Sequence, residues 1–367
     1  MYLFDLKQET NKKVVVGMSG GVDSSVAAYL LKEKGYKVTG LFMQNWQNEP
    51  GEKCTSEIDF KDASSVCDRL EIPLHKANFS DDYWNNVFEE FLNEYKLGRT
   101  PNPDILCNRE IKFKSFLNYA LTIGADYIAT GHYASLKNIN DKTYLSRAKD
   151  IAKDQTYFLH EVKEPEFKKC IFPLENLMKS DVRKIAKEIG LSVSSKKDSV
   201  GICFVGEKNM KDFLGRFIKL EKGPILDEDN NIIGEHNGST LYTIGQRQGL
   251  QIGGIKDKDD LPWYVYKKDI LKNHIFVCQG VNNNLLYCKG LECEDISWIN
   301  DDYDFDSIEC MIQIRHQHEP VDCQIDYLND RYVIKFNKPI RGVALGQSAV
   351  FYKKNICMGG GVISRAF

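Results

Sequence analysis

Short apolar runs alternate with amphipathic patterns of helical length between residues 12 and 130. The expected strands are 14–16, 38–43, 74–77 and 127–129, and the expected helices are 24–34, 58–70, 81–97 and 112–123. This order is typical of an α/β domain in which helices cover both faces of a parallel sheet. Ligands of such sheets bind beyond the carboxyl ends of the strands, so a site is expected in the loops there.

The pattern of residues along the sequence changes after about residue 205. A further helix, expected at 180–189, still belongs to the first domain, whereas Gly-Pro, Asn-Gly and Gly-Gly pairs then divide the chain into short runs. From about residue 275, strand-like alternation interrupted by regular turns predicts an antiparallel β-barrel. We therefore expect an α/β catalytic domain (1–205), a small β-rich module (206–275) and a C-terminal barrel (276–367).

Composition limits the possible functions only weakly. The chain of 367 residues is 42% hydrophobic and carries a net charge of −3, so any nucleic-acid surface must be a local basic patch. The apolar runs are far shorter than the roughly 20 residues that span a bilayer, and the first ten residues do not resemble a signal peptide. We expect a cytoplasmic protein without a membrane partner.

The eleven cysteines include no Cys-x-x-Cys pair, which argues against a zinc ribbon or a disulfide framework.

A loop of small residues follows the first expected strand. It consists of Gly17, Met18, Ser19, Gly20, Gly21, Val22, Asp23 and Ser24. Backbone N–H groups at such a strand-to-helix junction can surround a phosphate, and glycine allows the backbone to approach closely. The lysine of a Walker A loop is missing. A glycine-rich turn without a ligand is the alternative.

The run from Ser19 to Ser24 resembles the pyrophosphate loop of N-type ATP pyrophosphatases. These enzymes split ATP between its α and β phosphates and adenylate a carbonyl or carboxylate. Synthetases of several unrelated products share this loop, so it does not identify the substrate. The resemblance implies ATP, together with Mg²⁺, as the cofactor.

Other segments closely resemble the tRNA-specific 2-thiouridylases, the MnmA family, nearly from end to end. They are residues 98–108, 130–133, 153–155, 196–204, 244–247 and 345–348. The resemblance implies that ATP activates the 2-carbonyl of the wobble uridine and that a cysteine persulfide supplies sulfur. It also implies tRNA acceptors for Lys, Glu and Gln, and a persulfide donor that is either a cysteine desulfurase or a relay protein.

The same resemblance implies roles for individual residues. Cys203 carries the persulfide and Cys107 is the partner nucleophile. Residues matching ATP contacts are Gly17 to Ser24, Met43 and Gly131. Residues matching contacts to the target base are Asn102, Pro103 and Asp104. Residues matching other tRNA contacts are His132, Lys153, Asp154, Gln155, Arg315, His316 and Gln347. The family commonly has Tyr where this chain has His316, so that contact is in doubt.

Alternatives remain open at several of these positions. The two cysteines could instead help to hold an iron–sulfur cluster, although they lack local cysteine clustering. Basic residues near Cys107, including Arg109, Lys112 and Lys114, would favour its thiolate if they fold beside it. An amide-forming synthetase and a nucleotide sensor that binds RNA are the competing functions. The synthetase would need an ammonia source, and the sensor would not need the cysteine pair.

Overall fold

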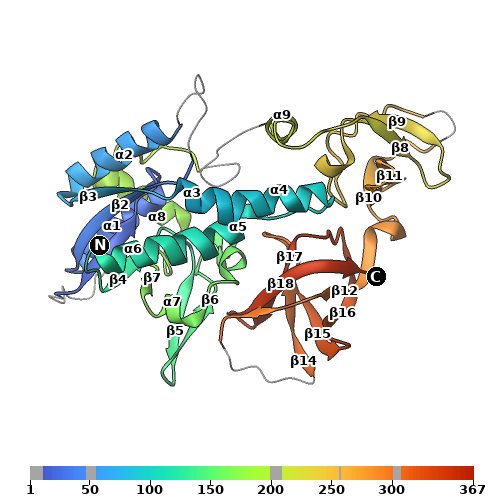
Figure 1. Ribbon diagram of the computed structural model, residues 1–367. Coiled ribbons are helices and arrows are strands. Elements are labelled where there is room, and N and C mark those ends of the chain that lie inside the picture. The colour runs from blue at the N-terminus through green and yellow to red at the C-terminus, as the bar shows by residue number, and fades with distance from the viewer. Residues whose placement is uncertain (1–10, 47–54, 199–208, 256–257, 301–306) are drawn as a thin grey trace.

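The computed structural model describes residues 11–46, 55–198, 209–255, 258–300 and 307–367. Cys203 lies outside these residues, and so do parts of the 196–204 segment. The first domain lies on the left in Figure 1, with the barrel at the lower right and the middle module at the upper right. No helix among the described residues is long and apolar enough to cross a membrane.

A five-stranded parallel sheet forms the centre of the first domain, with the strand order β3-β2-β1-β4-β7. Its strands are β1 (Lys13–Gly17), β2 (Lys37–Gln44), β3 (Leu74–Asn78), β4 (Tyr127–Ala129) and β7 (Cys170–Ile171). Each strand that was expected here is present. Apolar runs such as Val14 to Val16 form the inner strands because residues buried on both faces of a sheet must be apolar along their whole length. The edge strand β3 is different, because three of its five residues are exposed.

Side chains alternate between the two faces of this sheet. Val14 and Val16 pack with α1 (Val22–Glu33), α2 (Thr55–Leu70) and α8 (Lys179–Glu188). Val15 points to the opposite face, where it shares a core with Leu41 and Met43 of β2. That second face is covered by α3 (Ser80–Tyr83), η1 (Trp84–Phe88), α4 (Glu89–Lys96), α5 (Pro103–Leu106), η2 (Cys107–Ser115) and α6 (Phe116–Thr122).

The helical segment expected at 112–123 begins nine residues earlier, at Pro103. The Oδ1 atom of Asn102 accepts a hydrogen bond from the backbone N–H of Asp104 at 3.2 Å and so caps the helix. Pro103 occupies the first turn, where its missing N–H costs nothing. The Asn-Pro pair is therefore a helix start, and Cys107 lies inside the helical segment instead of in a loop.

The middle module contains a four-stranded sheet, in the order β10-β11-β8-β9. Its elements are β8 (Gly223–Leu226), β9 (Ile232–His236), β10 (Trp263–Asp269) and β11 (His274–Gln279), with α9 (Met210–Leu214) and η5 (Ser239–Leu241). The run at 275–278, expected to be the first strand of the barrel, pairs instead with β10 and β8. Its alternating pattern predicts a strand but cannot say which sheet the strand joins.

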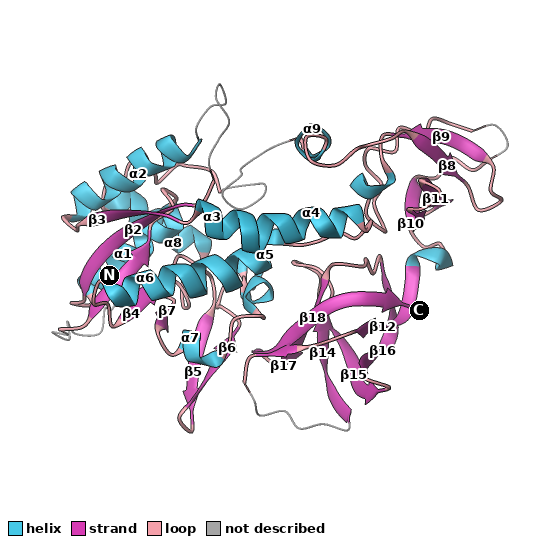
Figure 2. Ribbon diagram, viewed as in Figure 1, coloured by secondary structure: helices cyan, strands magenta, loops and turns pink. Residues whose placement is uncertain are grey.

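The C-terminal strands form a closed antiparallel barrel (Figure 2). In sheet order they are β12 (Tyr287–Cys293), β16 (Arg331–Arg341), β15 (Val321–Leu328), β14 (Ser307–Gln313), β17 (Ser348–Lys353) and β18 (Ile356–Ala366), and β18 pairs with β12. The short β13 (Ser297–Trp298) also pairs with β18, and η6 (Asn284–Leu286) precedes the barrel.

A hairpin of the first domain joins the barrel sheet. The hairpin consists of β5 (Ser135–Ile139) and β6 (Lys142–Ser146), and β6 pairs with β18. Next to it lie η3 (Ile151–Lys153), η4 (Thr156–Leu159) and α7 (Glu164–Phe167). The buried Tyr157 donates its hydroxyl to the carbonyl of Ser348 at 3.0 Å. The first domain and the barrel therefore share both a sheet and a hydrophobic core, which fixes their relative position.

Candidate functional site

The small-residue loop joins β1 to α1 at the carboxyl edge of the parallel sheet. Gly20 has φ +71°, and a Cβ atom there would overlap the carbonyl oxygen of Asp59. The Ser24 hydroxyl accepts a hydrogen bond from the N–H of Ser19 at 3.3 Å and donates one to the carbonyl of Gly21 at 3.2 Å. A residue with a side chain would not fit at Gly20, so the loop conformation depends on glycine.

The first turn of α1 offers backbone donors to a ligand. The N–H of Ser25 donates to the carbonyl of Gly21, so the N–H groups of Val22, Asp23 and Ser24 come before the first intrahelical bond. N–H groups in this position and the helix dipole together attract phosphate. The segment from Gly17 to Ser24, called the phosphate loop below, can therefore donate several N–H groups to a phosphate.

Two other residues matched to ATP contacts lie against this loop. A Cβ atom added to Gly131 would be 2.6 Å from the backbone nitrogen of Ser24, so only glycine allows the approach. The Cε atom of Met43 lies 3.2 Å from the position that a Cβ of Gly17 would take. The structure thus brings the loop, Met43 and Gly131 together, although they are far apart in the sequence.

Asp23 at the start of α1 forms an ion pair with Lys179. The Nζ atom of Lys179 is 2.7 Å from both carboxylate oxygens of Asp23, and the Tyr133 hydroxyl donates to Asp23 at 3.0 Å. Burial and the charge of Asp23 raise the pKa of Tyr133, so this hydroxyl remains protonated. These contacts hold the phosphate loop against α8.

Sequence reasoning missed Lys179. It is the first residue of α8, where a cation is unfavourable next to the positive end of the helix dipole. This lysine is held by two carboxylates, because its Nζ atom is also 2.8 Å from Asp198. A lysine in the first turn of a helix was the available signal in the sequence.

Asp198 connects this ion pair to two more cations. It accepts hydrogen bonds from Lys153 and Arg183, both at 2.7 Å. Partial burial alone would raise its pKa, but the hydrogen bonds from Lys153 and Lys179 lower the pKa of Asp198 to about 2. Lys153, matched to a tRNA contact, is therefore part of the network behind the phosphate loop, with 42% of its side chain exposed.

Cys107 lies on the face of the sheet that Met43 also faces. Phe116, which follows η2, lies beside Gly17 at the end of β1. From Phe116 the chain continues to Asp126, whose N–H bonds to the carbonyl of Lys13 at the other end of β1, so this helical segment runs antiparallel to the strands. The nine residue steps from Phe116 back to Cys107 therefore extend roughly 10–14 Å past the strand ends. Cys107 itself is fully buried. It therefore lies beyond the carboxyl edge of the sheet, on the same side as the phosphate loop.

Two cations expected to act on Cys107 are paired with carboxylates. Arg109 donates to Glu110 at 2.7 Å and to Glu161, and Lys114 donates to Glu110 at 2.6 Å. Their charges are largely balanced where they lie. The expectation that Arg109 and Lys114 promote a thiolate at Cys107 therefore receives no support from their positions.

The loop before Asn102 is fixed by all three domains. The N–H of Thr100 donates to the carbonyl of Leu345 at 2.8 Å, and Gln347 donates to the carbonyl of Thr100 at 2.7 Å. The hydroxyl of Thr100 is 3.1 Å from that of Thr243 in the middle module. The segment matched to the target base is therefore positioned by the assembly of the domains, and Gln347 takes part in it.

Arg315 and His316, matched to tRNA contacts, also connect domains. A guanidinium nitrogen of Arg315 donates to the carbonyl of Ile244 at 2.6 Å. The Nε2 atom of His316 is 3.1 Å from the carbonyl oxygen of Asp154, and its ring centroid is 4.4 Å from that of Phe158. In this structure both side chains hold the barrel against the other domains.

Other residues matched to tRNA contacts are buried or engaged. His132 has a 2.7 Å hydrogen bond with Thr130, and burial lowers the pKa of His132 well below its usual value. Asp154 accepts a hydrogen bond from the N–H of Ala148 at 3.0 Å, and burial raises its pKa. The side chain of Gln155 accepts from the N–H of Tyr133 at 2.9 Å. Contacts between these residues and tRNA remain predictions.

Asn45 is a second residue that sequence reasoning missed. It follows β2 by one residue and is only 2% exposed, yet neither atom of its carboxamide has a hydrogen-bond partner within the described part of the chain. By strand alternation it is on the same face as Met43. A buried carboxamide without partners costs about 1–3 kcal/mol, so its burial two residues after Met43 is unusual.

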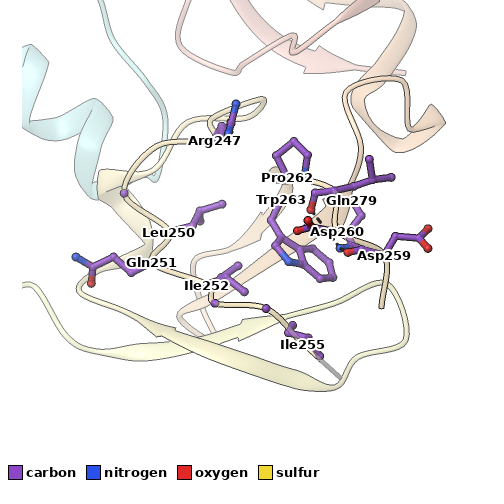
Figure 3. A pocket seen from close by; sticks show the side chains of 14 residues that line it. Arg247, Leu250, Gln251, Ile252, Ile255, Asp259, Asp260, Pro262, Trp263 and Gln279 are labelled. Atoms are coloured by element: carbon purple, nitrogen blue, oxygen red, sulfur yellow. Dashed lines mark hydrogen bonds between the residues drawn. The ribbon is translucent and has the colours of Figure 1, made fainter. Parts of the chain in front are cut away.

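Two open pockets lie outside the phosphate loop. The larger, of about 370 Å³, is in the middle module and is lined by Arg247, Trp263, Gln279 and the loop that contains Gly253 and Gly254 (Figure 3). The other, of about 280 Å³, lies between the first domain and the barrel and includes Arg99 and Arg109. No group of three or more His, Cys, Asp or Glu side chains suited to a metal ion occurs among the residues that are described.

Known proteins match the chain over nearly its whole length. Residues 12–207 match the profile of the tRNA methyl transferase HUP domain, 211–279 its PRC-barrel domain, and 288–363 the aminomethyltransferase β-barrel domain. The tRNA-specific 2-thiouridylase MnmA of Buchnera aphidicola subsp. Schizaphis graminum is 52% identical over 357 residues, which are 96% of this chain and 97% of that protein. The enzyme of the same name from Salmonella typhimurium is 49% identical over 97% of this chain and 98% of its own.

One solved structure similar to part of the chain is the U34-tRNA thiolase NcsA from Methanococcus maripaludis with its [4Fe-4S] cluster. It is 23% identical, with a TM-score of 0.35, and the match covers 51% of this chain and 59% of NcsA.

Proposed function

Because this chain belongs to the tRNA-specific 2-thiouridylase family, we propose that it is an ATP-dependent tRNA-uridine 2-sulfurtransferase acting on the wobble uridine. One observation carries the proposal. The phosphate loop, with Met43 and Gly131 against it, and the helix that bears Cys107 share one edge of the parallel sheet. An activating nucleotide and a sulfur nucleophile could therefore act on one bound base.

The chemistry proceeds in two stages. The 2-carbonyl oxygen of uridine attacks the α phosphate of ATP, which forms an adenylated base and releases pyrophosphate. A sulfur nucleophile then adds to the ring carbon, and AMP leaves with the former carbonyl oxygen. The N–H groups at the start of α1 would bind the phosphates, and Mg²⁺ would accompany the nucleotide.

Two cysteines divide the sulfur transfer between them. Cys203 accepts sulfur from a persulfide donor, which is a cysteine desulfurase or a relay protein. Cys107 then attacks the inner sulfur of that persulfide, so a disulfide forms between the cysteines as the outer sulfur is released to the base. An external reductant restores both thiols. The alternative of an iron–sulfur cluster would require both cysteines to be metal ligands.

The tRNA would be bound by all three domains in a cytoplasmic protein that acts on acceptors for Lys, Glu and Gln. Asn102, Pro103 and Asp104 would contact the flipped base, as recognition of single-stranded RNA usually requires. The proposal keeps a first domain of residues 1–205 and a middle module from 206, but it moves the start of the barrel domain from 276 to a point after β11, because β11 pairs within the middle sheet.

The test is to measure AMP, pyrophosphate and tRNA 2-thiouridine together, with and without tRNA. We expect AMP release that depends on tRNA, and one 2-thiouridine for each AMP when a persulfide donor is present. AMP release with an amide product and no thiolated tRNA would identify a synthetase. Binding of ATP and RNA without hydrolysis would identify a sensor.

A second experiment separates the two cysteines. Cys203→Ser should fail to accept labelled persulfide sulfur, whereas Cys107→Ser should accept it and fail to release it to tRNA. Both variants should bind ATP normally, because a thiol-to-hydroxyl change alters reactivity more than volume. If anaerobically purified protein contained iron that both variants lost, the cysteines would be cluster ligands and this mechanism would be wrong.

A further inference from the structure

Two cysteines of the barrel lie opposite each other on neighbouring strands. Cys310 in β14 pairs with Cys323 in β15 in the antiparallel register. Their Sγ atoms are 3.6 Å apart, within hydrogen-bonding distance for sulfur, although the residues are thirteen positions apart in the sequence. Neither residue belongs to the segments that the proposed sulfur transfer uses.

The two thiols differ in their access to solvent. Cys323 is only 3% exposed and belongs to the barrel core, whereas Cys310 is partly exposed and packs at the edge of that core. No third potential ligand completes a metal site with them in the described residues. The arrangement is therefore a dithiol between one partly exposed cysteine and one buried cysteine.

We propose that Cys310 and Cys323 are an oxidation site, at which hydrogen peroxide converts the two thiols into a disulfide. The Sγ atom of Cys310 attacks one peroxide oxygen, the O–O bond breaks, and a sulfenic acid and one water form. The Sγ atom of Cys323 then attacks the sulfur of Cys310, the S–O bond breaks, and a second water leaves. Two thiols are oxidised while one peroxide is reduced to two waters.

The backbone already suits this bond. Directly opposed residues in antiparallel strands have Cα atoms about 4.5 or 5.5 Å apart, and most disulfides have Cα separations of 4.4–6.8 Å. Side-chain rotation is therefore enough to shorten the sulfur separation to the bonded distance. The hydrogen bond with Cys310, together with burial, raises the pKa of the Cys323 thiol. Cys310 is consequently the sulfur that reacts first.

The disulfide would close the β14–β15 hairpin. The segment between the two cysteines contains Arg315 and His316, which contact the middle module and the first domain. Cross-linking this segment restricts the unfolded barrel more than the folded one. Oxidation should therefore raise the temperature at which the barrel unfolds, by about 5 °C.

The experiment treats the full-length protein with a small excess of hydrogen peroxide, blocks the remaining thiols and digests with trypsin. Trypsin cuts after Arg315, so the disulfide would join two peptides that separate after reduction. We expect the linked pair in the wild type, with a rise in the melting temperature that dithiothreitol reverses. Cys310→Ser and Cys323→Ser should each lose both the linked peptides and the temperature shift.

Cys288→Ser is the matched control, because Cys288 is another partly exposed barrel thiol. It should form the linked peptides and show the shift as the wild type does. The proposal would be overturned if Cys310 were oxidised to sulfinic acid while Cys323 still reacted with the blocking reagent. A disulfide from Cys310 to any other cysteine would also overturn it. Melting of the untreated serine variants checks that they are folded.

Discussion

The phosphate loop and the Arg99–Asp104 loop, whose last two residues form the first turn of α5, are held in different ways. The phosphate loop is positioned within its own domain, through Gly131 and the pair of Asp23 and Lys179. The Arg99–Asp104 loop is positioned through Thr100, which contacts both the middle module and the barrel. One site is therefore local, and the other exists only when the domains are assembled.

This difference separates the two half-reactions that we propose. Changes behind the phosphate loop should impair nucleotide chemistry and leave tRNA binding intact. Changes at the barrel side of the Arg99–Asp104 loop should impair the use of tRNA and leave ATP binding intact. Variants that violated this division would show that the two loops are coupled more closely than their contacts indicate.

Asp23→Ala should have the largest effect. Removing the carboxylate leaves Lys179 without its bidentate partner and releases the loop from α8, so AMP formation should fall at least about 100-fold. The affinity for tRNA should remain within about twofold, because the hydrogen bonds of Asp23 are to Lys179 and Tyr133, neither of which is matched to a tRNA contact. Single-turnover AMP release and filter binding measure the two quantities. Asp68→Ala, at an exposed position on α2, is the control. Normal AMP release by Asp23→Ala would disprove the role of this loop.

Two glycine substitutions compare the loops directly. In Gly131→Ala the new methyl group would lie 2.6 Å from the nitrogen of Ser24, and in Gly346→Ala it would lie 2.7 Å from the Cβ atom of Arg99. Gly131→Ala should weaken ATP binding at least about 10-fold and spare tRNA binding. Gly346→Ala, at φ +84°, should show the opposite pattern and destabilise the barrel by about 1–3 kcal/mol. Calorimetric titration with ATP and with tRNA would measure both affinities. A variant that weakened both would show that the two loops are coupled.

The same contrast explains what the sequence could reveal. The strands of the first domain and the phosphate loop follow from local patterns, so they could be predicted residue by residue. The role of Lys179 could not, because its partner Asp23 is far away in the sequence. The burial of the Asn45 carboxamide without a partner is also visible only in the folded chain. The pairing of β11 with the middle sheet and of β6 with β18 also depends on tertiary contacts. Local alternation predicts a strand, but a register between distant segments needs the assembled fold.

Gln347→Leu tests the barrel contact alone, with a smaller effect. It removes the hydrogen bond to the carbonyl of Thr100 without adding bulk, which should cost about 1 kcal/mol. We expect the KM for tRNA to rise about 5-fold while the KM for ATP stays the same. Gln324→Leu makes the same chemical change on the exposed face of β15 and should alter neither value. An increase in the KM for ATP alone would show that Gln347 acts on the phosphate loop and not on the Arg99–Asp104 loop.

Asp198→Asn should have the smallest effect and tests the network behind the phosphate loop. The pKa of Asp198 is lowered to about 2 in the folded protein, below its ordinary value of 3.8. A lowered carboxylate pKa stabilises the fold fully above about pH 4, and this contribution is lost as the pH falls towards 2. Because more than a third of the side chain is exposed, solvent limits the contribution to about 1 kcal/mol or less. Urea unfolding should therefore show the wild type as more stable than Asp198→Asn at pH 7, with the difference shrinking between pH 4 and pH 2.

Lys179 keeps Asp23 as its partner in this variant, so AMP formation should fall less than about 10-fold. A larger loss would mean that Asp198 itself holds the loop, and that the local site extends to the segment that leads towards Cys203.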